Sequence, residues 1–289
     1  APQGSLPVFH GGWVGMAGFD AVRWLEPLKL PFTSAPPDDR RLPDLHMGLY
    51  RSVVVFDHVT RLMHAVTAVP LDDHASESAA LEVGERELDG IEGQLASEAP
   101  PLDSAAINMD LAALPAAPAR SSFSREGFEQ AVRTAQEYIA AGDIFQVVLS
   151  QRLERSTSAD PFEIYRALRV VNPSPYMIYL QTAGAILIAS SPEILCRTRG
   201  PIVTSRPLAG TQPRDSDPER DRALEAELLA DEKERAEHVM LVDLARNDLS
   251  RVCAHGTVEV AESMAIERFS HVMHISSTVI GRLHDGMDG

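Results

Sequence analysis

The chain of 289 residues has a formal net charge of −16 at pH 7, and 44% of its residues are hydrophobic. This length suits one large domain or two, and the composition is that of a globular protein. The negative charge weighs against nucleic acid or an anionic membrane surface as a partner, because phosphate binding needs clustered Lys and Arg. No apolar run approaches the ~20 residues that span a bilayer. With only Cys196 and Cys253 and no secretion signal in residues 1–9, we expect a cytoplasmic protein.

The first part of the chain predicts short strands, a hairpin and one helix. The glycine-rich residues 8–26 are typical of strands and turns whose backbones approach closely. Residues 49–57 predict a buried strand, with residues 61–69 as its hairpin partner. Residues 76–98 are helical by composition, and the Ala, Pro and Ser of residues 99–122 predict a linker. We therefore expect an N-terminal region over residues 1–98, this linker, and a second region over residues 123–289.

The second half has clearer periodicity. Ser124 and Gly142 fit the N-cap and the stop of a helix between them. Asp217 and Pro218 open a long helix that continues past residue 240. Further expected elements are a strand at 144–152, a helix at 161–172, and strands at 176–181, 185–190, 193–199 and 202–206. Strands followed by long helices, rather than strict alternation of the two, predict an α+β fold.

Residues 231–248 begin as a charge run and end as an apolar-periodic helix. On a helix, Glu234 and Glu237 share one face, with Cβ atoms about 5–6 Å apart. Most charge runs of this kind are solvated helix faces. Here Glu237 falls in register with an apolar stripe that runs through Leu244. An inward carboxylate needs a partner, and a hard cation such as Mg²⁺ is one that fits.

Three other positions have both a plain and a chemical interpretation. Gly210 and Thr211 follow a strand, as an ordinary turn would, yet they also offer close backbone approach and a hydroxyl to an anion. Glu193 follows a Ser-Pro turn; on the surface it is a capping residue, whereas in an apolar pocket its pKa rises and it can act as a general acid. His274 lies in an apolar segment, where histidine is more often a hydrogen-bonded core residue than a catalyst.

Taken in order, several segments resemble the chorismate-utilising enzymes, and among them component I of anthranilate synthase. These segments are residues 9–20, 43–50, 142–152, 172–177, 191–193, 206–211, 231–248 and 268–274. The resemblance covers the chain apart from the linker and implies mainly antiparallel β-sheets packed with helices. It implies conversion of chorismate and ammonia to anthranilate and pyruvate in tryptophan biosynthesis. It also implies Mg²⁺ as cofactor and a glutamine amidotransferase subunit as the source of ammonia.

The resemblance assigns roles to individual residues. Glu237 matches the Mg²⁺ ligand of the family, and Glu234 matches the neighbouring acidic residue of the active site. Glu193 matches the acid that protonates the departing ring hydroxyl, and His274 matches the active-site histidine.

Two further groups of residues match binding positions of the family. Gly210 and Thr211 match the backbone and hydroxyl contacts to chorismate. Pro175, Tyr176 and Met177 match part of a regulatory tryptophan pocket, although a turn entering a strand accounts for them nearly as well. The companion segment of that pocket, a Leu-Leu-Glu-Ser pattern, is absent from this sequence.

Two positions separate related activities. Isochorismate and salicylate synthases carry a lysine where this chain has Gln146, and aminodeoxychorismate synthases typically carry a nucleophilic lysine where it has Ala209. Both differences favour anthranilate synthase. The alternatives are an aminodeoxychorismate or amino-deoxyisochorismate synthase, a non-catalytic relative and an inactive fragment. Because family members continue beyond residue 289 with a second metal-binding glutamate, we expect a piece truncated at both ends to bind Mg²⁺ weakly and to be inactive alone.

Overall fold

The computed structural model describes residues 6–99 and 119–289. The described chain consists of antiparallel sheets and helices, which confirms the α+β prediction. It divides into two compact units, one with residues 6–99 and 179–187 and the other with residues 119–178 and 188–289. Among the helices of these residues, none combines the length and the apolar character needed to cross a membrane. Residues 100–118 of the predicted linker lie outside the described residues, whereas two of its last residues form the short strand β5 (Arg120–Ser121).

The first unit contains two antiparallel strand pairs and one long helix. The strands are β1 (Gly12–Ala17), β2 (Leu45–Tyr50), β3 (Ser52–Asp57) and β4 (Leu62–Thr67), paired β1 with β2 and β3 with β4. The helices are α1 (Val22–Leu25), α2 (Glu77–Ala96) and the short 3₁₀ turns η1 (Phe19–Ala21), η2 (Phe32–Ser34) and η3 (Leu71–Asp73). A Cβ atom placed at Gly15 of β1 would lie 1.9 Å from the carbonyl oxygen of His46. The expected close approach of backbones is therefore present.

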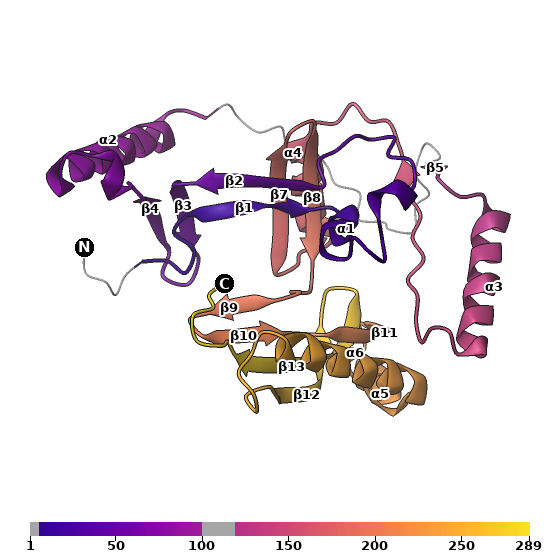
Figure 1. Cartoon of the computed structure of the whole chain (residues 1–289). Helices are drawn as coiled ribbons and strands as arrows, with labels where there is room; N and C mark the ends of the chain where they lie inside the picture. The colour runs from indigo at the N-terminus through magenta and orange to yellow at the C-terminus, as the bar shows by residue number, and fades with distance from the viewer. Residues whose placement is uncertain (1–5, 100–118) are drawn as a thin grey trace. The chain divides into compact units, whose positions relative to one another are not determined.

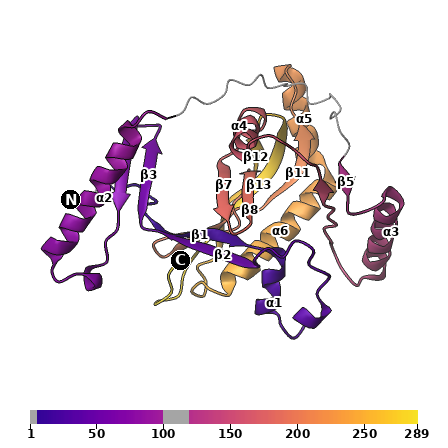
Figure 2. The same ribbon diagram turned by 90° about the horizontal axis from the view of Figure 1, so that it is seen from above.

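The hairpin of β3 and β4 confirms one prediction and corrects its detail. Helix α2 lies along this hairpin (Figure 2), where Glu87 accepts a hydrogen bond of 2.6 Å from the Thr67 hydroxyl. The single buried strand expected over residues 49–57 is instead the end of β2 and the whole of β3, separated at Arg51. It is only partly buried, and Phe56 is 61% exposed. The alternation of apolar and polar residues predicted the strands correctly. The strands are not buried on both faces, because a single helix covers only one face of a two-stranded sheet.

Before the main sheet of the second unit, the predicted helices agree with the structure, whereas one predicted strand does not. Helix α3 (Arg125–Ala141) begins as predicted, with the Ser124 hydroxyl accepting from the Gly127 N–H at 3.0 Å, and ends at Gly142 with φ of 82°. Helix α4 (Pro161–Val171) also matches. The strand expected at residues 144–152 is wrong, because these residues pair with no described strand. Short pairs complete this part of the chain: β5 (Arg120–Ser121) with β6 (Leu153–Glu154), and β7 (Tyr176–Thr182) with β8 (Ala185–Ser191), of which residues 179–187 belong to the first unit.

A five-stranded antiparallel sheet organises the rest of the second unit. Its strands are β9 (Arg197–Arg199), β10 (Ile202–Ser205), β11 (Leu208–Pro213), β12 (Glu259–Arg268) and β13 (Val272–Arg282). Strand β13 is central: β12 pairs along most of its length, while β11 and β10 pair with successive parts of it. The expected strand at 193–199 is confirmed only in its last three residues, because β10 offers partners to residues 197–199 alone.

Helices α5 (Pro218–Ala230) and α6 (Glu232–Ser250) lie against this sheet (Figure 1). The sequence predicted one long helix here, and that prediction is wrong at Asp231. The Asp231 backbone is extended, and its carboxylate accepts from the N–H groups of Lys233 at 2.9 Å and Glu234 at 3.0 Å. Asp231 is thus an N-cap that ends one helix and starts another.

The core lies between these helices and the sheet. Apart from Ala80 and Leu180, the buried apolar residues of the described chain lie between Val203 and Leu283. They form two clusters, one of Leu224, Leu228, Met273 and Ile275, and one of Val203, Ala245, Leu249, Cys253, Val279 and Leu283. The odd-numbered residues of β13 face the helices, as the two-residue period of a strand requires. The sheet and helix α6 therefore form the rigid base on which the candidate site is built.

Candidate functional site

A cross-strand pair on β11 and β13 brings three of the predicted residues together. Thr211 lies opposite His274 in the register of the two strands. The His274 Nδ1 atom is 2.9 Å from the Gly210 carbonyl oxygen and 3.1 Å from the Thr211 hydroxyl. Because a carbonyl oxygen only accepts, Nδ1 carries the hydrogen, and Nε2 of the neutral ring is the nitrogen that can accept a proton. The ring of Phe269, with its centroid 5.6 Å from that of His274, packs against it.

Gly210 occupies a position that only glycine fills easily. Its φ is 73°, and the register of β11 against β13 shifts at this point, so the strand carries a bulge. A Cβ atom placed here would lie 3.2 Å from Leu228, 3.3 Å from Ile275 and 3.4 Å from the Glu234 Oε2 atom. One side of Gly210 therefore contacts the acidic helix while its carbonyl group holds His274.

Glu193 precedes β9 and lies beside the same strands. Although much of the residue is exposed, burial of its carboxyl group raises the pKa above the usual range. A hydrogen bond from the Leu208 backbone and the charge of the nearby His274 act in the opposite direction and are the weaker influences. A carboxyl group that keeps its proton to higher pH is suited to act as a general acid.

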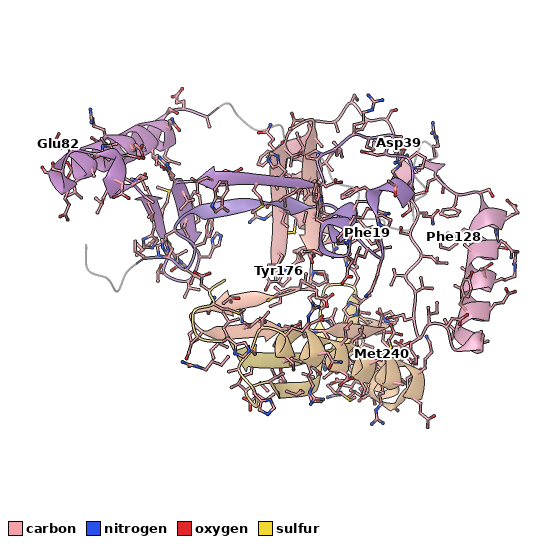
Figure 3. All side chains as sticks on the ribbon, in the orientation of Figure 1. Phe19, Asp39, Glu82, Phe128, Tyr176 and Met240 are labelled. Atoms are coloured by element: carbon pink, nitrogen blue, oxygen red, sulfur yellow. The ribbon has the colours of Figure 1, made fainter. Side chains whose placement is uncertain are left out.

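The acidic pair lies in the first two turns of α6. Glu234 and Glu237 are both partly buried, and the Lys233 ammonium is 3.4 Å from Glu234 Oε1. The expected apolar stripe is corrected: Leu244 is 54% exposed, and the buried residues of α6 are His238, Ala245 and Leu249. Met240 (Figure 3) lies on the same helix and is partly buried. Glu234, one turn before His238, continues the buried face more closely than Glu237 does.

Gln146 contacts the acidic pair directly. Its side-chain Nε2 donates a hydrogen bond of 3.0 Å to Glu237 Oε1, across 91 residues of sequence. The sequence singled out Gln146 as a position that separates activities, but it gave no sign of this contact. A neutral amide here orients the carboxylate and leaves its charge available, whereas an amine would neutralise it.

The donor atoms of this site fit a magnesium ion that is shared with substrate and water. Mg²⁺ prefers oxygen ligands and usually binds through one or two carboxylates while keeping several waters. Within residues 6–99 and 119–289, no group of three or more His, Cys, Asp or Glu side chains is arranged to hold a metal ion. The two carboxylates of Glu234 and Glu237 match the number that such a magnesium site uses.

Two of the three residues of the predicted regulatory pocket lie in a strand. Tyr176, labelled in Figure 3, and Met177 begin β7, and Pro175 precedes them. The Ser174 hydroxyl lies 3.3 Å from the Tyr176 carbonyl oxygen and 3.7 Å from the Met177 sulfur. These contacts are those of a turn that enters a strand, and the tryptophan pocket stays a prediction.

Comparison with known proteins identifies the family of the chain. The family model described as chorismate binding enzyme matches residues 1–289. An anthranilate synthase alpha subunit from the chloroplast of rice, Oryza sativa subsp. indica, is 52% identical over 286 residues, covering 99% of this chain and 50% of the relative. An aminodeoxychorismate synthase component 1 from Bacillus subtilis is 43% identical over 283 residues, covering 98% of this chain and 57% of the relative.

A solved structure agrees in fold as well as in sequence. The crystal structure of anthranilate synthase component I from Streptococcus pneumoniae is similar with a TM-score of 0.81 and 34% identity, over 99% of this chain and 60% of that protein. The chain thus spans about half the length of the curated rice relative that it matches. The chain belongs to the chorismate binding enzyme family.

Proposed function

We propose that the full protein containing this chain is an anthranilate synthase large subunit, which converts chorismate and ammonia to anthranilate and pyruvate. The observation that carries this proposal is the arrangement around Gly210. Its carbonyl group holds His274, and its Cα side faces the carboxylate of Glu234. Gly210 therefore lies next to both the proposed base, His274, and one of the proposed metal-binding carboxylates, Glu234.

Departure of the ring hydroxyl requires a proton donor. Hydroxide is a poor leaving group, so ammonia can add to the ring and water can leave only when an acid protonates the oxygen. Glu193 is our candidate for this acid, because burial raises its pKa. A base then removes the proton from the ring carbon that bears the amino group. The bond between the ring and the enolpyruvyl oxygen breaks, which restores aromaticity, and the departing enolate takes up a proton to become pyruvate. His274, whose Nε2 can accept a proton, is the nearby base.

Binding of the dianionic substrate by an acidic protein needs local positive charge. Glu234 and Glu237 would hold Mg²⁺, which when bound neutralises the substrate carboxylate and orients the ring. Gly210 and Thr211 supply the close backbone approach and the hydroxyl group that the family uses for chorismate. Gln146 keeps the Glu237 carboxylate in place without neutralising it. Ammonia would come from a glutamine amidotransferase subunit.

Aminodeoxychorismate synthesis is the second candidate, and the Bacillus subtilis relative favours it. Against it stands Ala209, which faces Ile275 in the strand register and has no amine that could attack the ring. The compartment is proposed to be the cytoplasm for a bacterial protein, whereas the rice relative is chloroplastic.

The test uses the purified full protein with chorismate, Mg²⁺ and an ammonium salt, and identifies the product by mass and fluorescence. We expect anthranilate, and we expect Glu193→Gln to lower kcat about 10²–10⁴-fold. Glu259→Gln is the matched control, because Glu259 is an exposed glutamate of β12. Aminodeoxychorismate or isochorismate as the wild-type product would contradict the proposal, and so would equal activity of the two variants.

A further inference from the structure

A histidine beside the acidic pair is fully buried. His238 follows Glu237 in α6, lies one helical turn after Glu234, and has no exposed surface. Its Nε2 atom is 2.7 Å from the hydroxyl oxygen of Ser277 on β13, which is also fully buried.

Ser277 joins this histidine to two more parts of the sheet. Its hydroxyl oxygen accepts a hydrogen bond of 3.0 Å from the Met264 N–H. Met264 has a φ of 54° and lies where the register of β12 against β13 shifts. The Ser277 N–H in turn donates to the Pro207 carbonyl oxygen, just before β11. One serine therefore connects α6, β12, β13 and the start of β11.

Packing alone does not account for a histidine at this position. The second ring nitrogen, Nδ1, is buried and has no hydrogen-bond partner among the described residues. A buried polar atom without a partner is unfavourable, and an apolar side chain of similar volume would avoid that penalty. What the imidazole provides and a leucine would not is one directional bond to β13.

We propose that His238 is a positioning residue, which through Ser277 fixes the rotation of α6 so that Glu234 and Glu237 face the site around Gly210. The acidic pair and His238 lie within five consecutive residues, so the bond acts on the turn that carries both carboxylates. A carboxylate about 6 Å from the helix axis moves by about 1 Å when the helix rotates by about 10°. A displacement of about 1 Å in a catalytic constellation can lower a rate about 10²-fold.

The experiment compares variants of the full protein, and its activity arm rests on the proposed function. His238→Leu removes the bond and fills the space, whereas His238→Gln retains an amide that reaches Ser277. Ser277→Ala removes the other partner. Ser276→Ala is the matched control, because Ser276 is fully buried on the same strand and its hydroxyl has no described partner. For each we would measure chorismate consumption, the half-saturating Mg²⁺ concentration and the midpoint of urea unfolding.

We expect His238→Leu to remain folded with an unchanged or higher urea midpoint, while kcat falls at least about tenfold and the half-saturating Mg²⁺ concentration rises. His238→Gln should retain most of the activity, and Ser276→Ala should match the wild type. The double variant His238→Leu/Ser277→Ala should be no worse than the more impaired single variant, because both remove the same bond. Full activity of His238→Leu, or losses that multiply in the double variant, would overturn the proposal.

The two proposals fail in different ways. Chorismate consumption is independent of which product forms, so a product other than anthranilate contradicts the proposed function and leaves the positioning comparison intact. A wild type that consumes no chorismate also contradicts the proposed function. The positioning inference is then judged on amide hydrogen exchange in the first turns of α6, where protection that His238→Leu leaves at the wild-type level overturns it.

Discussion

Replacement of Gly210 by alanine tests the geometry on which the site depends. Gly210 has φ of 73°, and alanine in this left-handed conformation costs about 1–2 kcal/mol. The lower entropy of alanine in the unfolded chain offsets about 0.4–1 kcal/mol of that. The net conformational penalty is therefore about 1 kcal/mol.

Crowding adds a second penalty that is specific to this position. The added Cβ would meet Leu228 at 3.2 Å and Ile275 at 3.3 Å, and both side chains are fully buried and cannot easily move. Overpacking of this kind costs about 1–3 kcal/mol, so the total loss in free energy of unfolding is about 2–4 kcal/mol. The Glu234 carboxylate, at 3.4 Å, is the more flexible neighbour and would shift, so catalytic activity should fall as well.

The control is Gly256→Ala. Gly256 has φ of 76°, nearly that of Gly210, but no atom lies within 4 Å of a Cβ placed there. Its substitution should therefore cost only the conformational part, about 1 kcal/mol, and leave activity unchanged. Amide hydrogen exchange across β13 is the suitable assay, because the tryptophans, Trp13 and Trp24, both belong to the first unit. Equal destabilisation by the two substitutions would refute the crowding argument.

Three further predictions concern single side chains. Because the pKa of Glu193 is raised, its acid form persists to higher pH, and activity at constant free ammonia should decline as the pH rises through that pKa. Glu193→Gln should abolish this decline. A decline that persists in the variant would exclude Glu193 as the acid. Thr211→Val removes one contact to His274 and the hydroxyl proposed to bind chorismate, but it leaves the bond between His274 and the Gly210 carbonyl group, so kcat/KM should fall about 10- to 100-fold. An unchanged kcat/KM would contradict the proposed contact with chorismate. The Arg214 guanidinium holds the pKa of Asp221 below its usual range. The ion pair therefore stabilises the fold above the unfolded-state pKa of Asp221, and this stabilisation is lost as the pH falls through the folded-state pKa. Asp221→Asn should lower the urea midpoint at pH 7 and approach the wild type in acid, and a difference that stays constant with pH would contradict this.

Local features of the fold could be predicted from sequence because their causes lie within a few residues. The cap at Ser124 and the left-handed Gly142 each satisfy helix-end groups of their own neighbourhood. Strand formation at residues 144–152 failed as a prediction because a strand needs a partner that its own pattern does not contain. Asp231 was hidden in a run of charges, although an aspartate whose side chain can reach the next two or three N–H groups is also a helix-start signal.

The candidate site depends on register, which the sequence pattern alone does not reveal. His274 meets Gly210 across 64 residues, and Gln146 meets Glu237 across 91. Composition assigned Glu234 and Glu237 to a solvated face as readily as to a metal site. The ordered series of motifs gave the assignment, and the strand bulge at Gly210 supplies a physical reason why the acidic helix and His274 lie close together.

The central claim is tested most directly by titrating Mg²⁺ into the full protein with chorismate and ammonium, while anthranilate is followed by its fluorescence. The wild type should form anthranilate with a saturable dependence on Mg²⁺. Glu237→Gln should need a much higher Mg²⁺ concentration, because it removes one of the two carboxylates offered by α6. Anthranilate formation that does not respond to Mg²⁺, or that Glu237→Gln leaves unchanged, would contradict the site described for this chain.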